Sequence, residues 1–426
     1  MTSNILKYPK NAHSTYRLLL TLRNNVVRVK FIKIIKKANS MTNNSLNLVP
    51  ASVDDYRKLA EKRLPRAFFD YIDGGSFQEQ TASANINAFN SLQLRQRVLS
   101  DVSSIDTNCQ LFGQKLDMPL ILGPVGLAGC FAKRGEVQAF KAANAAQLPF
   151  CLSTVSICSI EELNGSATAP FWFQLYVIRD RSYAIKLMQK AQNAGCETLV
   201  FTVDLPVLGE RYRDIRNGLS GKLSYANSFR RNLNIISHPK WLWDVAIKGK
   251  PLVFGNLLEV VQDANSLQDF KGWFDSQFDA SMTWDDLGWI RDNWSGNIVI
   301  KGIMDSEDAK QAIRVGADAI VVSNHGGRQL DCVPATLSVL PEIVACVDKQ
   351  CKVIVDGGIR SGLDIVKAMA LGADACLIGR AWAYALAANG EAGVRHMLSI
   401  MKNEMRVAMA LTAVTKVAEI NQNILR

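Results

Sequence analysis

The 426-residue sequence lacks several features that would point to other classes of protein. It contains no run of about 18 apolar residues, so a membrane-spanning helix is not expected. Its nine cysteines form no CxxC pair and have no regular spacing, which predicts reduced thiols in a reducing compartment and neither a disulfide framework nor a metal site. No GxGxxG motif follows an early apolar segment, so a Rossmann-type dinucleotide site has no support.

Basic residues are concentrated at the start of the chain. Residues 1–40 contain nine Lys or Arg residues and no acidic residue, which leaves 40 basic and 39 acidic residues in the remainder. A nucleic-acid-binding protein would carry its basic residues across a folded face, so no nucleic acid partner is expected. Three interpretations of this arm stay open: an over-extended start with Met41 as the initiator, a disordered basic tail, or a targeting peptide. Residues 1–48 are predicted to be an extension outside the fold, and residues 49–426 one domain.

Eight short apolar segments recur from Met118 onward, and each ends in polar or glycine residues. They begin at Pro119, Pro149, Phe171, Thr198, Asn297, Asp318, Lys352 and Asp374. Helix-patterned stretches separate most of them, such as residues 135–147, 181–195, 306–317 and 361–373. Continuous apolar strands that alternate with helices predict an α/β fold with a parallel sheet covered on both faces. Eight such units predict a TIM (β/α)8 barrel, with an open doubly wound sheet as the alternative.

The fourth and fifth apolar segments are separated by about 95 residues, too many for a simple connection between a strand and a helix. An insertion is predicted over approximately residues 219–282. Its middle, 229–257, contains five Lys or Arg residues, one acidic residue and the tryptophans Trp241 and Trp243. Basic residues interleaved with tryptophan suit a peripheral membrane contact, whereas a lid or subunit-packing segment would bury the tryptophans. Both interpretations stay open.

The stretch AIVVSNHGGRQLD, residues 319–331, carries the strongest functional signal. An apolar, β-branched run is followed within one short loop by Asn324, His325, two glycines, Arg328 and Asp331. A histidine moves protons near neutral pH, and an arginine offers a planar fork for a carboxylate or phosphate. The other three histidines lie in no comparable setting. The segment predicts the edge of an active site, with an ordinary surface loop as the alternative.

The last two apolar segments are followed by candidate phosphate-binding loops. DGGIRSG, residues 356–362, offers glycine amides and Arg360 before a helix, and IGRAW, residues 378–382, offers Arg380 before the next. Helix N-termini and glycine-rich loops bind phosphate through N–H groups, and barrels often place such a site after strands seven and eight. Lys301 at another strand end suits a conjugated ring, because a buried lysine stabilises negative charge on the ring after reduction. Together these residues predict flavin mononucleotide (FMN) rather than a nicotinamide dinucleotide.

From about Val53 to the C-terminus the chain resembles the FMN-dependent L-2-hydroxy acid dehydrogenases and oxidases. The most specific motif is SNHGGRQLD at 323–331, and TVDLPVLGERYRDIRNG at 202–218 is close behind. HPKWLWD at 238–244 and GRAWAYALAANGEAGV at 379–394 are most similar to the membrane-associated, quinone-linked bacterial L-lactate dehydrogenases of this family.

The resemblance also implies roles for individual residues. His325 is the expected active-site base, and Asp204 orients its imidazole. Arg211 and Arg328 are expected to clamp the substrate carboxylate. Tyr71 adds a hydrogen bond, and Tyr176 contacts the substrate hydroxyl. The residues expected to hold the flavin ring, the ribityl chain and the phosphate are Pro124, Val125, Gly126, Ser153, Gln174, Thr202, Lys301, Ser323, Asp356, Gly357, Gly358, Arg360, Gly379 and Arg380.

The predicted function is FMN-dependent oxidation of L-lactate to pyruvate, with electrons passed to a membrane quinone of the respiratory chain. An oxidase or dehydrogenase of glycolate or mandelate, using O₂ or another acceptor, is the alternative within the family. A non-redox barrel isomerase and a catalytically silent membrane-bound binding protein are the alternatives outside it. The resemblance implies a homotetramer at the cytoplasmic face of the bacterial inner membrane, with the cytoplasm as the second choice.

Overall fold

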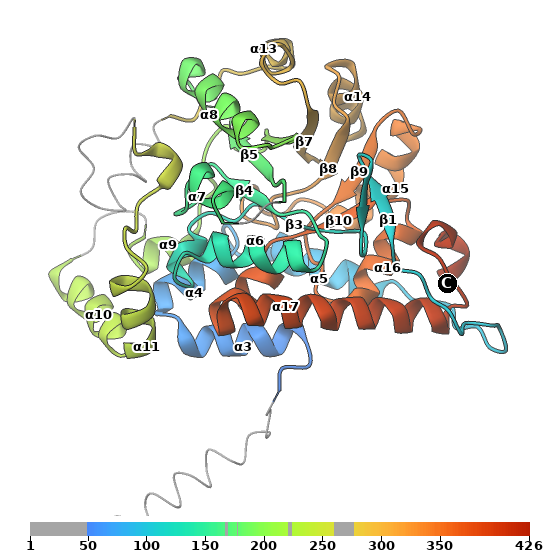
Figure 1. The fold of residues 1–426 in the computed structure, drawn as a ribbon, viewed down its shortest axis with the longest axis horizontal. Coiled ribbons are helices and arrows are strands. Elements are labelled where there is room, and N and C mark those ends of the chain that lie inside the picture. Colours follow the sequence, from blue (N-terminus) through green and yellow to red (C-terminus); the bar gives the residue numbers. More distant parts are fainter. Residues whose placement is uncertain (1–48, 167–168, 177, 220–223, 260–276) are drawn as a thin grey trace, which may run out of the picture. The chain divides into compact units, whose positions relative to one another are not determined.

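The computed structural model describes residues 49–166, 169–176, 178–219, 224–259 and 277–426. Apart from residues 49 and 50, these belong to one compact unit, Ala51–Arg426, which is shown as a ribbon in Figure 1. The predicted extension at residues 1–48 lies outside the described residues. Residues 220–223 and 260–276 of the predicted insertion lie outside them as well.

In the described part of the chain, eight parallel strands form a barrel. Their order around the sheet is β3-β10-β9-β8-β7-β6-β5-β4, and a parallel bridge between Leu122 and Phe150 joins the two ends. The predicted TIM barrel is therefore confirmed, and each of the eight apolar segments contains one strand. The strands are β3 (Leu120–Leu122), β4 (Cys151–Ser153), β5 (Trp172–Tyr176), β6 (Thr198–Thr202), β7 (Asn297–Ile303), β8 (Ala319–Val322), β9 (Lys352–Val355) and β10 (Ala375–Ile378).

The strands are buried on both faces, which explains why they read as continuous apolar runs rather than alternating ones. One irregularity matters for the site. The register of β7 against β8 shifts between Lys301 and Ile303. Gly302, between them, has a φ of 116°, and a Cβ there would lie 2.6 Å from Cβ of Asp204. The glycine therefore lets the end of β7 approach the end of β6, which brings Lys301 and Asp204 together.

Helices follow the strands and cover the barrel, as Figure 1 shows. The four helix-patterned stretches at 135–147, 181–195, 306–317 and 361–373 each contain a helix, as predicted. Ser361 and Asp364 form a capping box that fixes the start of the last of these. The helices after the strands are α6 (Gly135–Ala145), α7 (Ile160–Asn164), α8 (Arg181–Asn193), α13 (Gly288–Asn293), α14 (Ser306–Arg314), α15 (Thr336–Val347), α16 (Gly362–Ala370) and α17 (Arg380–Leu411).

Three helices and a hairpin precede the barrel and were not identified from the sequence. They are α3 (Val53–Arg63), α4 (Arg66–Asp73), α5 (Gln80–Ser91), β1 (Cys109–Leu111) and β2 (Gln114–Leu116). α3 packs along α17, which is kinked at Asn389 and Gly390. Short helical turns complete the described chain: η1 (Ala128–Cys130), η5 (Val417–Glu419) and η6 (Gln422–Ile424).

Two tryptophans of the insertion between β6 and β7, Trp241 and Trp243, differ in their exposure to solvent. Trp241 is buried, stacks on Phe68 at 5.0 Å between ring centroids, and donates a hydrogen bond to the carbonyl oxygen of Cys130 at 2.8 Å. Trp243 is 57% exposed. The burial of Trp241 agrees with a packing segment, whereas the exposure of Trp243 leaves it available for a membrane contact. The helical elements between β6 and β7 are α9 (Tyr212–Arg216), α10 (Tyr225–Ile236), α11 (Pro239–Trp241), the π-helical turn η2 (Leu242–Ile247), η3 (Gly255–Leu257) and η4 (Trp284–Leu287).

Candidate active site

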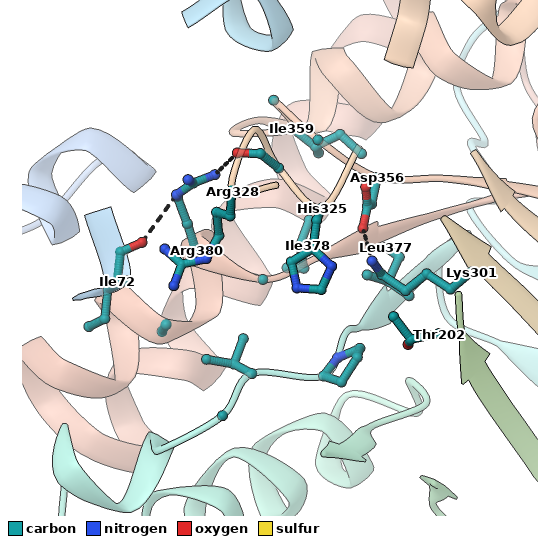
Figure 2. Close-up of a pocket in the computed structure, with 18 of the residues that line it drawn as sticks. Ile72, Thr202, Lys301, His325, Arg328, Asp356, Ile359, Leu377, Ile378 and Arg380 are labelled. Atoms are coloured by element: carbon teal, nitrogen blue, oxygen red, sulfur yellow. Dashed lines mark hydrogen bonds and ion pairs between the residues drawn. The ribbon is translucent and has the colours of Figure 1, made fainter. Parts of the chain in front are cut away.

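A pocket opens at the carboxyl ends of the barrel strands, where a TIM barrel carries its chemistry (Figure 2). It encloses about 940 Å³, with open solvent at its mouth included. Most residues proposed from the sequence line it: Tyr71, Pro124, Val125, Gly126, Tyr176, Thr202, Arg211, Lys301, His325, Arg328, Asp356, Gly357, Gly358, Arg360, Gly379 and Arg380. The other four are buried or nearly buried behind the wall: Ser153, Gln174, Asp204 and Ser323.

His325 and Asp204 form a hydrogen-bonded pair at the pocket. Nδ1 of His325 lies 2.9 Å from Oδ1 of Asp204. Burial lowers the pKa of His325, and the nearby Lys301 ammonium lowers it further, although Asp204 opposes both. Burial opposes ionisation of Asp204, but His325 and Lys301 outweigh it and lower the pKa of that carboxyl. A lowered pKa favours the neutral imidazole, and because Nδ1 faces the Asp204 carboxylate, Nε2 is the nitrogen available to accept a proton.

The ammonium group of Lys301 is buried beside the His325–Asp204 pair. Its Nζ donates to Oγ of Ser323 at 2.9 Å and lies 3.5 Å from Asp356 and 3.8 Å from Asp204. Burial would lower the pKa of Lys301, but the two carboxylates outweigh burial and raise it. Figure 2 shows the Lys301–Asp356 contact beside Thr202. A fixed positive charge therefore lies in the wall of the pocket, where it would stabilise negative charge on a reduced flavin ring.

Four arginines line the pocket, and the hydrogen-bond acceptors of their guanidinium groups within the described residues are carbonyl oxygens rather than carboxylates. One of them, Arg360, donates to the carbonyl of Ile359 at 2.8 Å. The other three are Arg328, Arg211 and Arg380. Arg328 donates to the carbonyls of Tyr71 and Gly74, both at 2.7 Å. Nε of Arg211 donates to the carbonyl of Arg328 at 3.3 Å. Burial, together with Arg211, lowers the pKa of Arg328 to about 10. A guanidinium that is buried beside another guanidinium favours an anionic ligand.

The last of these arginines, Arg380, stands at the start of α17. It donates to the carbonyls of Ile72 at 3.1 Å and Gly326 at 2.8 Å, and Figure 2 shows the first of these contacts. No side chain caps the N-terminus of α17. Gly357 and Gly358 lie beside it with φ values of 88° and 92°, a conformation that suits glycine. Uncapped helix N–H groups, glycine backbone and a buried guanidinium together suit a phosphate group.

Several buried polar atoms around the pocket have no hydrogen-bond partner among the described residues. They include Nε2 of Gln174, Oγ1 of Thr202, Oδ2 of Asp204 and Oδ1 of Asp356. An unsatisfied buried polar atom costs about 1–3 kcal/mol, so a group of them at one wall indicates a ligand with donors and acceptors along one edge. The residues present therefore fit a flavin ring and its ribityl chain, with the phosphate at Arg380.

Sequence reasoning missed six further residues that line the pocket: Ile72, Gly326, Ile359, Leu377, Ile378 and Ala383. Four of them lie in the loops or strand ends already singled out, and their position beside a predicted residue was the available signal. Ile72 and Ala383 lie on α4 and α17 near Tyr71 and Arg380, which the family resemblance had already placed at the site, so the same signal of neighbouring position applied to them.

The family model described as FMN-dependent dehydrogenase matches residues 60–426. The chain belongs to this family. An L-lactate dehydrogenase of Caulobacter vibrioides (strain NA1000 / CB15N) is 52% identical over 378 residues, which are 89% of this chain and 98% of that protein. One of Haemophilus influenzae (strain PittEE) is 52% identical over 373 residues, 88% of this chain and 97% of that protein.

Solved structures agree with the family. The crystal structure of the monotopic membrane protein (S)-mandelate dehydrogenase has a TM-score of 0.83 and 38% identity, and covers 88% of this chain and 99% of its own. A mandelate oxidase with (S)-4-hydroxymandelic acid has a TM-score of 0.75 and 35% identity, over 88% of this chain and 98% of its own. The protein is therefore an FMN-dependent oxidoreductase that acts on 2-hydroxy acids.

The depressed pKa of His325 makes a prediction about pH. A base must be neutral to accept a proton, so kcat/KM should stay level as the pH falls through the ordinary imidazole value of 6.5 and should decline only in more acidic solution. Asp204→Asn removes the carboxylate that raises the pKa of His325. In this variant the fall of kcat/KM on the acid side should therefore move to still lower pH. Initial rates at low substrate concentration across the pH range measure both limbs. An acid limb at or above pH 6.5 in the parent protein contradicts the assignment.

Proposed function

We propose that the protein oxidises L-lactate to pyruvate and passes the electrons to a membrane quinone. The observation that carries the proposal is that one pocket is lined by an imidazole paired with Asp204 and by two guanidiniums whose hydrogen-bond acceptors within the described residues are carbonyl oxygens. Oxidation of a 2-hydroxy acid needs a base, an anchor for the carboxylate and an electron acceptor in contact. FMN, when bound, supplies the electron acceptor. The identity of the lactate dehydrogenase relatives supports lactate as the substrate.

In this proposal each side chain has a separate task. Arg211 and Arg328 hold the substrate carboxylate and so exclude neutral alcohols. Burial raises the pKa of both Tyr71 and Tyr176, so the two phenols stay protonated and serve as hydrogen-bonding groups to the substrate. His325 accepts a proton at Nε2 while Asp204 holds Nδ1, and the imidazolium that forms is stabilised by the carboxylate.

A larger 2-hydroxy acid such as mandelate is the second candidate. An apolar recess adjoins the active-site pocket and shares Tyr71, Tyr176 and Arg211 with it. Its apolar walls come from Leu127, Val155, Leu205, Leu208, Ile215, Phe254 and Phe278. A substrate held by its carboxylate would place a side chain larger than methyl toward these walls, as the mandelate-linked structural neighbours also suggest.

The membrane part of the proposal rests on α10. Its apolar side chains Tyr225, Phe229, Leu233 and Ile236 are spaced by four, four and three residues, so they share one face, and all are at least half exposed. Exposed Trp243 follows on η2, with Nζ of Lys248 4.9 Å from its ring centroid. An exposed apolar stripe flanked by basic residues suits an anionic lipid surface.

The described residues include no helix long and apolar enough to cross a membrane. On the strength of the exposed apolar face of α10, the proposal places the protein on the surface of the membrane. The family resemblance supports the cytoplasmic face of the bacterial inner membrane. It also supports a homotetramer as the assembly.

Anaerobic titration of the holoprotein tests the reaction. L-lactate should bleach the flavin absorbance with one equivalent per flavin, and D-lactate should not, because two guanidiniums and one base fix which face of the substrate carbon is presented. Parallel assays with L-mandelate and glycolate show which side chain on the α-carbon of the substrate the enzyme prefers. Bleaching by mandelate alone makes mandelate the substrate, and no bleaching by any of these acids contradicts the proposed function.

Vesicle binding tests the membrane contact. Phe229→Ser with Leu233→Ser should weaken binding to phosphatidylglycerol vesicles by about tenfold or more, because each inserted apolar side chain contributes ~1–2 kcal/mol. Lactate reduction of a soluble dye should be unchanged. The matched control is Val98→Ser with Leu99→Ser, which removes two exposed apolar side chains before β1. Equal binding by both double variants places the contact elsewhere.

A further inference from the structure

Two polar residues of the loop after β8 do not face the active-site pocket. Asn324 and Asp331 stand beside His325 and Arg328 in the sequence, but only the latter pair lines the pocket. Asn324 is 6% and Asp331 8% exposed. Both side chains point instead to α5, one of the helices that precede the barrel.

Asn324 forms a reciprocal amide pair with Asn85 of α5. Nδ2 of Asn85 donates to Oδ1 of Asn324 at 2.8 Å, and Nδ2 of Asn324 donates to Oδ1 of Asn85 at 3.0 Å. The same amides also hold backbone, since Gly327 N–H donates to Asn324 at 3.1 Å and Thr336 N–H donates to Asn85 at 3.2 Å. A buried network in which this many polar groups are hydrogen-bonded restricts the loop to a single arrangement.

Asp331 holds the other end of the loop to the start of α5. Its carboxylate accepts N–H groups from Gln78 at 3.1 Å, Gln80 at 3.3 Å and Thr81 at 2.8 Å. Glu79, the N-cap of α5, provides no side-chain cap of its own. A carboxylate from a distant loop therefore caps this helix and ties the loop to it at the same time.

The loop between these two contacts passes through the left-handed region of backbone conformation, which is unfavourable for His325. His325, Gly326 and Gly327 have consecutive φ values of 56°, 65° and 71°. A histidine in this region is strained, and strain persists only where the surroundings fix it. α5 also approaches the phosphate side of the pocket, because a Cβ on Gly358 would lie 2.3 Å from the carbonyl oxygen of Asn85. One helix therefore contacts both the base-bearing loop and the glycine loop.

We propose that Asn85, Asn324 and Asp331 are positioning residues for the oxidation. They hold the loop against α5 and thereby set the distance between His325, Arg328 and the cofactor loop. The inference rests on the proposed function, because it assigns these residues a part in the rate at which substrate reduces the flavin. None of the three lines the active-site pocket, so their effect passes through the loop.

Single-turnover reduction of the holoprotein by saturating L-lactate tests this role. In Asn85→Ala and Asn324→Ala the rate constant should fall by roughly ten- to a hundredfold, since a displacement of about 1 Å at a reacting group has effects of that size. The double variant should be no slower than the slower single variant, because both changes break one unit. Asn87→Ala, an exposed asparagine on the same helix, is the matched control and should keep the parent rate constant.

The rate constant and the amplitude of flavin reduction distinguish a positioning role from a purely structural one. If the amide pair only stabilised the fold, surviving holoprotein would be reduced at the parent rate with a smaller amplitude, and that result overturns the proposal. Reoxidation of the reduced variants by a soluble dye should keep the parent rate constant, because it uses neither His325 nor Arg328.

A second variant covers the case in which Asn85→Ala yields no holoprotein. Asp331→Asn keeps one oxygen for the α5 N–H groups, and it should slow reduction by at least severalfold with full flavin content. A parent rate constant in Asp331→Asn overturns the proposal. If L-lactate and the other 2-hydroxy acids fail to bleach the parent protein, the proposed function is wrong and the positioning role falls with it.

Discussion

Positive charge held partly out of water at the barrel mouth is the constraint on which the rest of the site depends. Arg211, Arg328, Arg360 and Arg380 line the pocket there, and in the described structure the hydrogen bonds of their guanidinium groups go to carbonyl oxygens. A charge partly removed from water without a counter-ion is unfavourable, so the pocket favours anionic ligands. FMN and a 2-hydroxy acid each carry one anionic group, a phosphate and a carboxylate. The arginines thus explain both ligands with one electrostatic argument.

The helices before the barrel complete this arrangement. The carbonyl groups at the end of α4 accept hydrogen bonds from Arg328 and Arg380, and the carbonyl oxygen of Gly74 accepts from both. These contacts position the two guanidiniums without neutralising them. α5 holds the loop that carries His325 through Asn85. The pocket is therefore not a property of the barrel alone, although residues at or just after the ends of seven of its strands line it. A fold that hosts many chemistries acquires this one through the elements packed against its mouth.

The sequence predicted those parts whose physical cause is local. Each strand was recognisable as an apolar run with a polar end, and the polar ends of parallel strands lie at the same end of a barrel. The expectation that His325 and Lys301 lie near each other follows from this, and both line one pocket in the structure. The roles assigned to these residues remain predictions. The hydrogen bond between α5 and the loop after β8 was not predictable. Asn85 and Asn324 lie 239 positions apart, and no local pattern in either segment indicates that they are in contact. Trp241 is similar, since its burial depends on Phe68 of α4.

The most direct test of the electrostatic account compares Arg328→Gln with Arg380→Gln for two ligands. Loss of one charge-assisted hydrogen bond costs about 1.5–3 kcal/mol, or roughly ten- to 150-fold in affinity. Arg328→Gln should raise the KM for L-lactate by that factor and keep the Kd for FMN. Arg380→Gln should weaken FMN by that factor, and its flavin-saturated form should keep the KM for L-lactate. If both variants lose the same ligand, or neither ligand is affected, the arginines do not divide the two anions between them.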